Sequence, residues 1–258
     1  MGSAGQQSDA YSATSRLSGS GRLVLFPSGA TNLAPVDPAS AFPVPGGGIQ
    51  YNNIFLRDLA TRRTRLVSRN EAGAALNSPS TGPILARNGR LAGFVSNATL
   101  LVPRATPTLP QLFVIGLATG RAEIASLGTD GREADRTPLP IAFSPEGRFV
   151  AFQTNSCTLV PGTGDNRGNL FVRDLVRGVT TLETVGFDGS PAVGPPLRGP
   201  NFSDGALTPG GGYLVFDSSA SNIVPGDDNG RSDVFVRDRK RGTIELISAA
   251  STSPSATA

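Results

Sequence analysis

Short apolar runs separated by turn residues recur four times along the chain, and each run ends on a phenylalanine five residues after a glycine. These phenylalanines are Phe26, Phe94, Phe152 and Phe216. Their spacing of roughly 60 residues is typical of one supersecondary unit that is stacked repeatedly, because a single unit cannot bury its own apolar faces. No stretch keeps a helical period over a helical length, so the pattern predicts β-strands.

The repeat covers several positions around each phenylalanine. A bulky apolar residue lies nine residues earlier, at Leu17, Leu85, Phe143 and Leu207. A proline lies nine residues later, at Pro35, Pro103, Pro161 and Pro225. A second phenylalanine follows at Phe55, Phe113, Phe171 and Phe235, and eleven residues beyond it stand Leu66, Ile124, Leu182 and Leu246. So many positions in step indicate a structural repeat.

Each unit reads as four antiparallel strands, with turn residues between them at the spacing of a propeller blade. The turn between the last two strands contains Gly120, Gly178 or Gly242 in three units, as hairpin turns favour. In the first unit Arg62 takes that position, which predicts a distorted turn or one of another type. The fold class is therefore all-β, a β-propeller with four blades of four antiparallel strands.

The predicted organisation is a single propeller domain spanning residues 15–248. Its blades cover about 15–68, 82–126, 139–184 and 204–248. Residues 1–14 and 249–258 lack the repeated apolar positions and are predicted to be flexible. We expect a monomeric ring in which blades one and four are neighbours. The alternative is an open half-ring that dimerises to eight blades.

Composition removes several chemistries from the chain. It contains no histidine and one cysteine, so it holds no serine–histidine triad, histidine metal site or zinc–thiolate cluster of its own. No phosphate-binding glycine motif is present. These absences predict that the chain is not an enzyme. The lone thiol, Cys157, is predicted to be half-buried, structural and unreactive, because no histidine can lower its pKa.

One loop has oxygen ligands at spacings that resemble part of a calcium loop. It runs from Pro225 to Asp233, and Asp227, Asn229 and Asp233 are its candidate metal ligands. Pro225 stands where a first aspartate would complete the pattern. The simpler interpretation is that these side chains hydrogen-bond to their own loop. No cofactor is expected, with calcium as the exception to be tested.

Three Arg-Asp pairs recur at one blade position: Arg57-Asp58, Arg173-Asp174 and Arg237-Asp238. A single active site would not need three copies. Their recurrence predicts an architectural role, with charge-assisted hydrogen bonds from blade to blade.

The stretch from Ser144 to Phe152, together with the run from Ser221 to Asp238, resembles the TolB-like, WD-type bacterial propeller repeats. The resemblance implies a propeller that contacts another protein in the bacterial envelope or outside the cell. It gives a non-catalytic scaffold as the predicted function, and a periplasmic or extracellular location with any leader already removed; the alternative location is the cytoplasm. We expect no hydrolase domain. The alternative is a carbohydrate-binding propeller, which the absence of tryptophan and the presence of only three tyrosines disfavour.

Two insertions in the repeat are candidate docking loops for that protein. They are residues 42–48 and 191–200, with Phe42, Val44 and Leu197 as apolar anchors. Neutral lengthening of surface loops explains both insertions equally well. Nucleic acid is not expected as a partner, and no segment is apolar over the length of a membrane span.

Overall fold

The computed structural model describes residues 5–35, 52–102, 108–163, 168–192, 206–227 and 229–249, and the backbone alone of 42–44 and 48–50. Within these ranges the regular structure is β-strand, apart from one 3-10 turn at Pro209–Gly211. No helix in the described ranges is long and apolar enough to cross a membrane.

Three antiparallel sheets contain four strands each. The first has the order β1 (Arg16–Leu17), β2 (Leu23–Ser28), β5 (Asn53–Asp58) and β6 (Arg63–Leu66). The second comprises β7 (Ser80–Leu85), β8 (Leu91–Ser96), β9 (Gln111–Gly116) and β10 (Ala122–Ile124). The third comprises β11 (Leu139–Phe143), β12 (Phe149–Thr154), β13 (Asn169–Asp174) and β14 (Val179–Leu182). We call these sheets blades one, two and three.

Blade four differs from the prediction, because its sheet has three strands: β15 (Tyr213–Ser218), β16 (Asp233–Asp238) and β17 (Thr243–Leu246). Of the expected first strand, the described residues show an isolated bridge between Leu207 and Leu214, and the residues before Ala206 lie outside the described part of the chain. The 3-10 turn Pro209–Gly211 follows this bridge. A further hairpin, β3 (Phe42–Val44) with β4 (Gly48–Gln50), is inserted between β2 and β5.

The blades stack through alternating side chains of their middle strands. In each blade the two repeated phenylalanines lie opposite each other, with ring centroids 5.6 to 6.4 Å apart. We call the side that carries them the Phe face and the opposite side the aliphatic face. Phe94 and Phe113 pack in one core cluster with Leu25, Ile54 and Leu56 of blade one.

The same contact is repeated at the next two junctions. Phe152 and Phe171 cluster with Leu112 and Val114 of blade two. Phe216 and Phe235 cluster with Leu170 and Val172 of blade three. The Phe face of each blade therefore packs on the aliphatic face of the blade before it, which explains why the phenylalanines hold the repeat in register.

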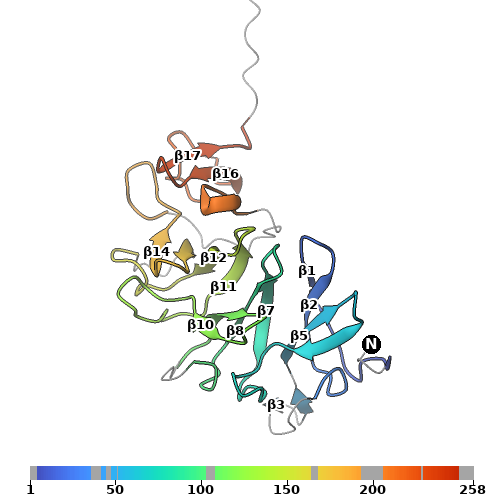
Figure 1. The fold of residues 1–258 in the computed structure, drawn as a ribbon. Coiled ribbons are helices and arrows are strands. Elements are labelled where there is room, and N and C mark those ends of the chain that lie inside the picture. The colour runs from blue at the N-terminus through green and yellow to red at the C-terminus, as the bar shows by residue number, and fades with distance from the viewer. Residues whose placement is uncertain are drawn as a thin grey trace, which may run out of the picture.

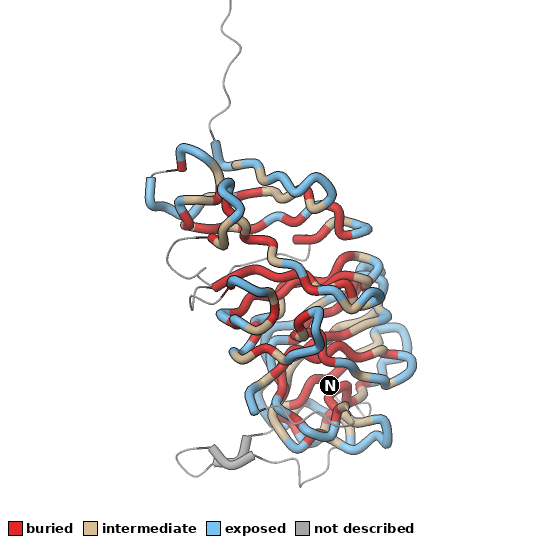
Figure 2. The backbone as a smooth tube through the Cα atoms, turned by 90° about the vertical axis from the view of Figure 1, so that its left-hand side faces the viewer, coloured by how far each residue is buried: buried red, intermediate tan, exposed pale blue. Residues whose placement is uncertain are grey.

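The four blades form an open arc. Figures 1 and 2 show blade one and blade four at opposite ends of the row, with blades two and three between them. Strand β7 of blade two packs against β1, β2 and β5 of blade one, and β11 of blade three packs against β7 and β8. The expected closed ring, with blades one and four adjacent, is not what the structure shows.

Arg62 does not distort its turn. Its φ is +55°, which is close to the +74°, +66° and +73° of Gly120, Gly178 and Gly242. The expectation of a different turn in blade one is therefore wrong. The hairpin requires a left-handed residue at this position, and Arg62 adopts that conformation at a steric cost that glycine does not carry.

The repeat also extends further toward the N-terminus than the apolar pattern indicates. Asp9 accepts a hydrogen bond from the backbone N–H of Thr31 at 2.9 Å. Asp135, at the same distance before its blade's first phenylalanine, accepts one from the N–H of Cys157 at 3.0 Å. Tyr11 reaches blade one as well, and its hydroxyl donates to Asn52 at 2.6 Å.

Candidate binding cleft between blades one and two

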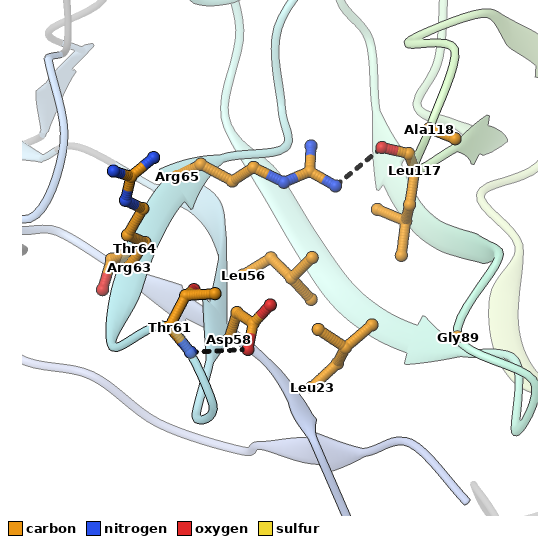
Figure 3. A pocket seen from close by; sticks show the side chains of 10 residues that line it. All are labelled: Leu23, Leu56, Asp58, Thr61, Arg63, Thr64, Arg65, Gly89, Leu117 and Ala118. Carbon is orange, nitrogen blue, oxygen red and sulfur yellow. Dashed lines mark hydrogen bonds between the residues drawn. The ribbon is translucent and has the colours of Figure 1, made fainter. Parts of the chain in front are cut away.

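A cleft of about 690 Å³ opens between the outer strands of blade one and two turns of blade two (Figure 3). Its volume lies within the range of small-molecule and peptide-side-chain sites. The β5–β6 hairpin forms one wall, and the turns that follow β7 and β9 form the other. Its lining comprises Leu23, Leu56, Asp58, Thr61, Arg63, Thr64, Arg65, Gly89, Leu117 and Ala118.

The floor of the cleft is apolar. The side chains of Leu23, Leu56 and Leu117 lie toward one another in Figure 3. Strand alternation places Leu56 here, because Leu56 and Ile54 lie on the aliphatic face, whereas Phe55 points to the other side of the sheet. The outer part of the junction stays open where blade two contributes turns and no further strand.

The acidic group of the cleft is already neutralised. Asp58 receives hydrogen bonds from Arg22 Nε to its Oδ1 at 3.1 Å and from Arg22 Nη2 to its Oδ2 at 2.6 Å. Its Oδ1 also accepts the N–H of Ala60 at 2.9 Å and that of Thr61 at 3.2 Å. The Arg22 hydrogen bond and these N–H donors lower the pKa of Asp58 more than desolvation raises it, so this pKa lies well below its usual value.

The basic group of the cleft has a neutral partner. Arg65 spans the junction and donates from Nη2 to the carbonyl oxygen of Leu117 at 2.7 Å (Figure 3). Burial lowers the pKa of Arg65, and the charge of Arg69 lowers it further. Among the described residues no carboxylate forms an ion pair with Arg65. The exposed guanidinium of Arg63 is on the same strand, so the cleft carries uncompensated positive charge.

The corresponding cleft between blades three and four is balanced. It measures about 310 Å³ and contains Arg148, Asp174 and Arg239. Arg239 Nε lies 2.9 Å from Oε1 of Glu183, a carboxylate that is 2 % exposed. Arg148 and Arg239 also lie over the ring of Phe149, 4.9 and 5.1 Å from its centroid. Here the guanidinium groups serve the junction itself, which leaves the cleft of blades one and two as the stronger candidate site.

The predicted blade-to-blade hydrogen bonds of the Arg-Asp pairs are seen for one arginine, Arg173, and a second arginine, Arg237, forms an ion pair across the next junction. Arg173 Nη1 donates to the carbonyl oxygens of Leu127 at 3.0 Å and Gly128 at 3.2 Å in blade two. Arg237 Nε lies 3.0 Å from Oε2 of Glu183 in blade three, an ion pair whose N–H is not aligned as a hydrogen bond. The aspartates have another role, because each accepts N–H groups of its own turn.

The candidate calcium ligands form a hydrogen-bonded loop. Asn229 Nδ2 donates to Asp233 Oδ2 at 3.0 Å, and Asn229 Oδ1 accepts the N–H of Arg231 at 2.7 Å. Ser248 Oγ donates to the other oxygen of Asp233 at 2.6 Å, and Asp227 is buried nearby in the chain. No group of three acidic, histidine or cysteine side chains in the described residues is placed to hold a metal ion. Calcium binding stays a prediction.

The predicted docking anchors cannot be assessed from side chains. Phe42 and Val44 lie in β3, where their backbone pairs with Gln50 and Gly48. Their side chains, and the whole of Leu197, lie outside the described residues. The docking surface stays a prediction. That prediction assumed that blades one and four are neighbours, whereas the arc places them at opposite ends (Figure 1).

Sequence reasoning did not find the cleft. The available signal was the departure of blades one and two from the repeat, with Arg65 where blades two and four have glutamate and Ile115-Gly116 where other blades have Arg-Asp.

The prediction for Cys157 also needs correction. Cys157 is exposed, and its thiol donates to Asp135 Oδ2 at 3.0 Å, so the predicted half-buried state is wrong.

No protein-family model matches the chain, and no curated protein is detectably similar in sequence. Solved structures are similar in fold. TolB from Acinetobacter baumannii is 13 % identical with a TM-score of 0.50, over 94 % of this chain and 44 % of TolB. The β-propeller domain of the trilobed protease from Pyrococcus furiosus, described as having an open velcro topology, is 13 % identical with a TM-score of 0.51, over 95 % of this chain and 59 % of that one. Puromycin hydrolase, as its S511A mutant, is 14 % identical with a TM-score of 0.52, over 95 % and 29 %.

These similarities establish a TolB-like β-propeller fold, and the chain spans less than two thirds of each of the three proteins. They overturn the prediction of a non-catalytic scaffold that is not an enzyme, because two of the three are a protease propeller domain and a hydrolase. The missing histidine excludes chemistry only within these 258 residues. It does not address an enzyme of which a propeller is one part.

Proposed function

We propose that this propeller is part of a peptide-hydrolysing enzyme and that the cleft between blades one and two takes up the peptide. The observation that carries the proposal is the cleft itself, an apolar floor beside an arginine with no acidic partner in the described residues, on a fold that protease and hydrolase structures share. A histidine base for such an enzyme would have to come from outside this chain.

The chemistry of the cleft selects the part of the peptide that binds. Arg65 and Arg63 favour a carboxylate, for which guanidinium is the preferred partner. Leu23, Leu56 and Leu117 favour an adjacent apolar side chain. The expected ligand is therefore a short extended peptide with a free C-terminal carboxylate on an apolar last residue. Asp58 is not expected to oppose it, because Arg22 already holds that carboxylate.

Fluorescence anisotropy with a labelled, unstructured peptide ending in phenylalanine tests this proposal. The free-acid peptide should bind, and its C-terminal amide should bind roughly tenfold more weakly, since a charge-assisted hydrogen bond is lost. R65M should weaken free-acid binding by a similar factor and leave the affinity for the amide almost unchanged. R63A should have a smaller effect in the same direction, because Arg63 is exposed.

R121A is the matched control, because it removes the same charge from an exposed site outside the cleft. Its binding should equal that of the wild type. Equal affinities for acid and amide peptides, or equal losses in R65M and R121A, would refute the proposed site. Circular dichroism of R65M checks that the variant, which loses the hydrogen bond to Leu117, keeps the β-structure of the wild type.

We also propose that the protein acts in the cell envelope or outside the cell. The similarity in fold to TolB and the resemblance of the repeats to TolB-like propellers support this location. Fractionation of the natural host with an antibody against the propeller tests it, and recovery with cytoplasmic markers alone would refute it.

A further inference from the structure

Eight turns lie at one end of the strands and form a continuous surface, which we call the turn face. With the residues that border them, they are 18–22 and 58–63 in blade one, 86–90 and 116–121 in blade two, 144–148 and 174–178 in blade three, and 208–212 and 238–242 in blade four. Strands that alternate in direction place both turns of a blade at the same end. A backbone hydrogen bond joins them, as from the N–H of Leu59 to the carbonyl oxygen of Arg22 at 2.9 Å.

Further hydrogen bonds continue the turn face from blade to blade. The N–H of Gly19 donates to the carbonyl oxygen of Arg87 at 2.8 Å. Asn88 Nδ2 donates to the carbonyl oxygen of Glu146 at 2.6 Å, and Oε1 of Glu146 accepts the N–H of Gly210 at 3.0 Å. The turn face therefore extends along the whole arc as one surface.

The positive charge of the chain is concentrated on the turn face. The eight ranges contain 11 of the 23 basic residues of the chain but only 4 of its 20 acidic residues. Their net charge is therefore +7, whereas that of the whole chain is +3, so the rest of the chain is net negative. A charge distribution of this kind orients a protein toward a negatively charged partner.

The acidic groups of the turn face are used within it. Asp174 and Asp238 are buried, Asp58 is half-buried, and each accepts N–H groups of its own turn. By contrast, six exposed cations form no ion pair with any acidic side chain that the structure describes: Arg62, Arg63, Arg87, Arg90, Arg177 and Lys240. The turn face therefore holds positive charge that an external anion can neutralise.

Exposed apolar side chains stand among these cations. Val176 is 77 % exposed, more than any other large apolar side chain in the described residues, and it directly precedes Arg177. Leu59 is 51 % exposed in the equivalent turn of blade one, and Tyr213, which follows the turn at 208–212, is 45 % exposed. Apolar and aromatic side chains among cations are typical of proteins that lie on an anionic membrane, where the apolar groups enter the headgroup region.

We propose that the turn face docks on an anionic phospholipid bilayer. The unpaired arginines and Lys240 contact lipid phosphates, which guanidinium groups bind well, and Val176 and Leu59 enter the headgroup region. The partner is a bilayer and not a soluble polyanion, because a polyanion in solution would leave these apolar side chains in water. The net negative remainder of the chain then faces away from the lipid.

Vesicle flotation tests the charge requirement. The wild type should float with vesicles that contain phosphatidylglycerol, should remain behind with vesicles of phosphatidylcholine alone, and should be released by high salt. The double variant R177E/K240E should bind at least roughly tenfold more weakly. The matched control is R132E/R231E, which makes the same change in net charge at exposed sites outside the turn face. Circular dichroism verifies the fold of both variants.

A single introduced tryptophan tests the apolar contact. The chain contains no tryptophan, so the emission of V176W reports this position alone. Its emission should shift to shorter wavelength with phosphatidylglycerol vesicles and stay unchanged with soluble polyglutamate. F187W is the control, because Phe187 is 61 % exposed but lies outside the turn face, and its emission should stay unchanged with both.

Three results would each overturn the proposal. The first is a wild type that does not bind phosphatidylglycerol vesicles. The second is an equal loss of binding in R177E/K240E and R132E/R231E. The third is binding without a shift in V176W, which would assign the positive charge to a soluble anionic partner. None of these results bears on peptide binding, because Val176, Arg177 and Lys240 do not line the cleft of blades one and two.

Discussion

Asp135 accepts a hydrogen bond from the thiol of Cys157, with 3.0 Å between Sγ and Oδ2, at the exposed edge of blade three. The same carboxylate accepts the backbone N–H of Cys157 at 3.0 Å. The hydrogen bond from the thiol to Asp135 raises the pKa of Cys157 above its usual value. The thiol can donate to the carboxylate, whereas the thiolate would be repelled by it.

Cys157 is therefore expected to react slowly despite its exposure. Since the thiolate is the nucleophile, alkylation by iodoacetamide at pH 8 should be slower than that of a free cysteine and should accelerate only at higher pH. D135N removes the negative charge and should increase the rate at pH 8. Cys157 is the single cysteine, so mass spectrometry reports this site alone. Equal rates for the wild type and D135N would contradict the prediction.

Replacing Arg62 with glycine should stabilise the protein. Arg62 holds a φ of +55°, and a side chain in this left-handed region costs about 1 kcal/mol. Glycine removes this cost, but it also makes the unfolded chain more flexible, which offsets part of the gain. R62G should raise the free energy of unfolding by roughly 0.5 kcal/mol in urea titrations. G178A, the opposite change at φ +66°, should lower it. A loss of stability in R62G would show that the arginine side chain contributes more than its backbone costs.

Truncating a phenylalanine inside a junction should be severe. Phe94 is fully buried between blades one and two, with its ring 6.4 Å from that of Phe113. F94A should lower the free energy of unfolding by about 3–5 kcal/mol, through lost burial and the cavity left behind. F187A makes the same change where the side chain is 61 % exposed and should have almost no effect. Comparable losses in both variants would be incompatible with the packing described.

The pair of Arg148 and Asp174 should make stability dependent on acid. Arg148 Nη2 donates to Asp174 Oδ2 at 2.6 Å, and this bond is the main reason that the pKa of Asp174 lies below its usual value of 3.8. The folded state thus favours the ionised group. Its contribution is complete above the unfolded pKa and is lost as the pH falls below about 4 toward the lowered pKa.

D174N should therefore be less stable than the wild type at pH 7, with the difference shrinking as the pH falls to 2. Thermal melts at several pH values measure this difference. D130N is the control, because Asp130 is 54 % exposed and pairs only within its own linker, with Arg132. A pH-independent difference between D174N and the wild type would assign its effect to packing and not to charge.

Calcium should have little influence on stability. Asn229 and Asp233 already hydrogen-bond to each other, and Ser248 occupies the second oxygen of Asp233. Melting temperatures in excess calcium and in chelator should therefore coincide. A rise in calcium that D233N abolishes would establish a metal site and displace the hydrogen-bonded interpretation of this loop.

The blade pattern was predictable because few residues determine it. The paired phenylalanines and their aliphatic neighbours are set by burial, which leaves a strong periodic trace in the sequence. The single bridge at Leu207, seen in the described part of blade four, was not predictable, because Leu207 keeps the apolar identity of the repeat. Nor was the turn at Arg62, since a left-handed residue other than glycine is chosen by its surroundings.

The candidate site was harder to predict than the fold. Arg65 and Leu117 are 52 residues apart, and each is unremarkable in its own unit. Their meeting depends on how two blades are set side by side, which the pattern within one blade does not encode. An alignment of the four units shows that Arg65 replaces an acid and that Ile115 replaces an arginine. It does not show that these two positions face the same junction, because that depends on which faces of the blades pack together.

Packing that always joins one blade to the next makes the cooperativity of this molecule one-dimensional. An inner blade is held on both sides and an end blade on one, so opening an end breaks one junction where opening the middle breaks two. Unfolding should then proceed as fraying, through a ladder of partly folded states that begins at an end. A protein built in this way can release a terminal blade while the remainder of the molecule keeps its shape.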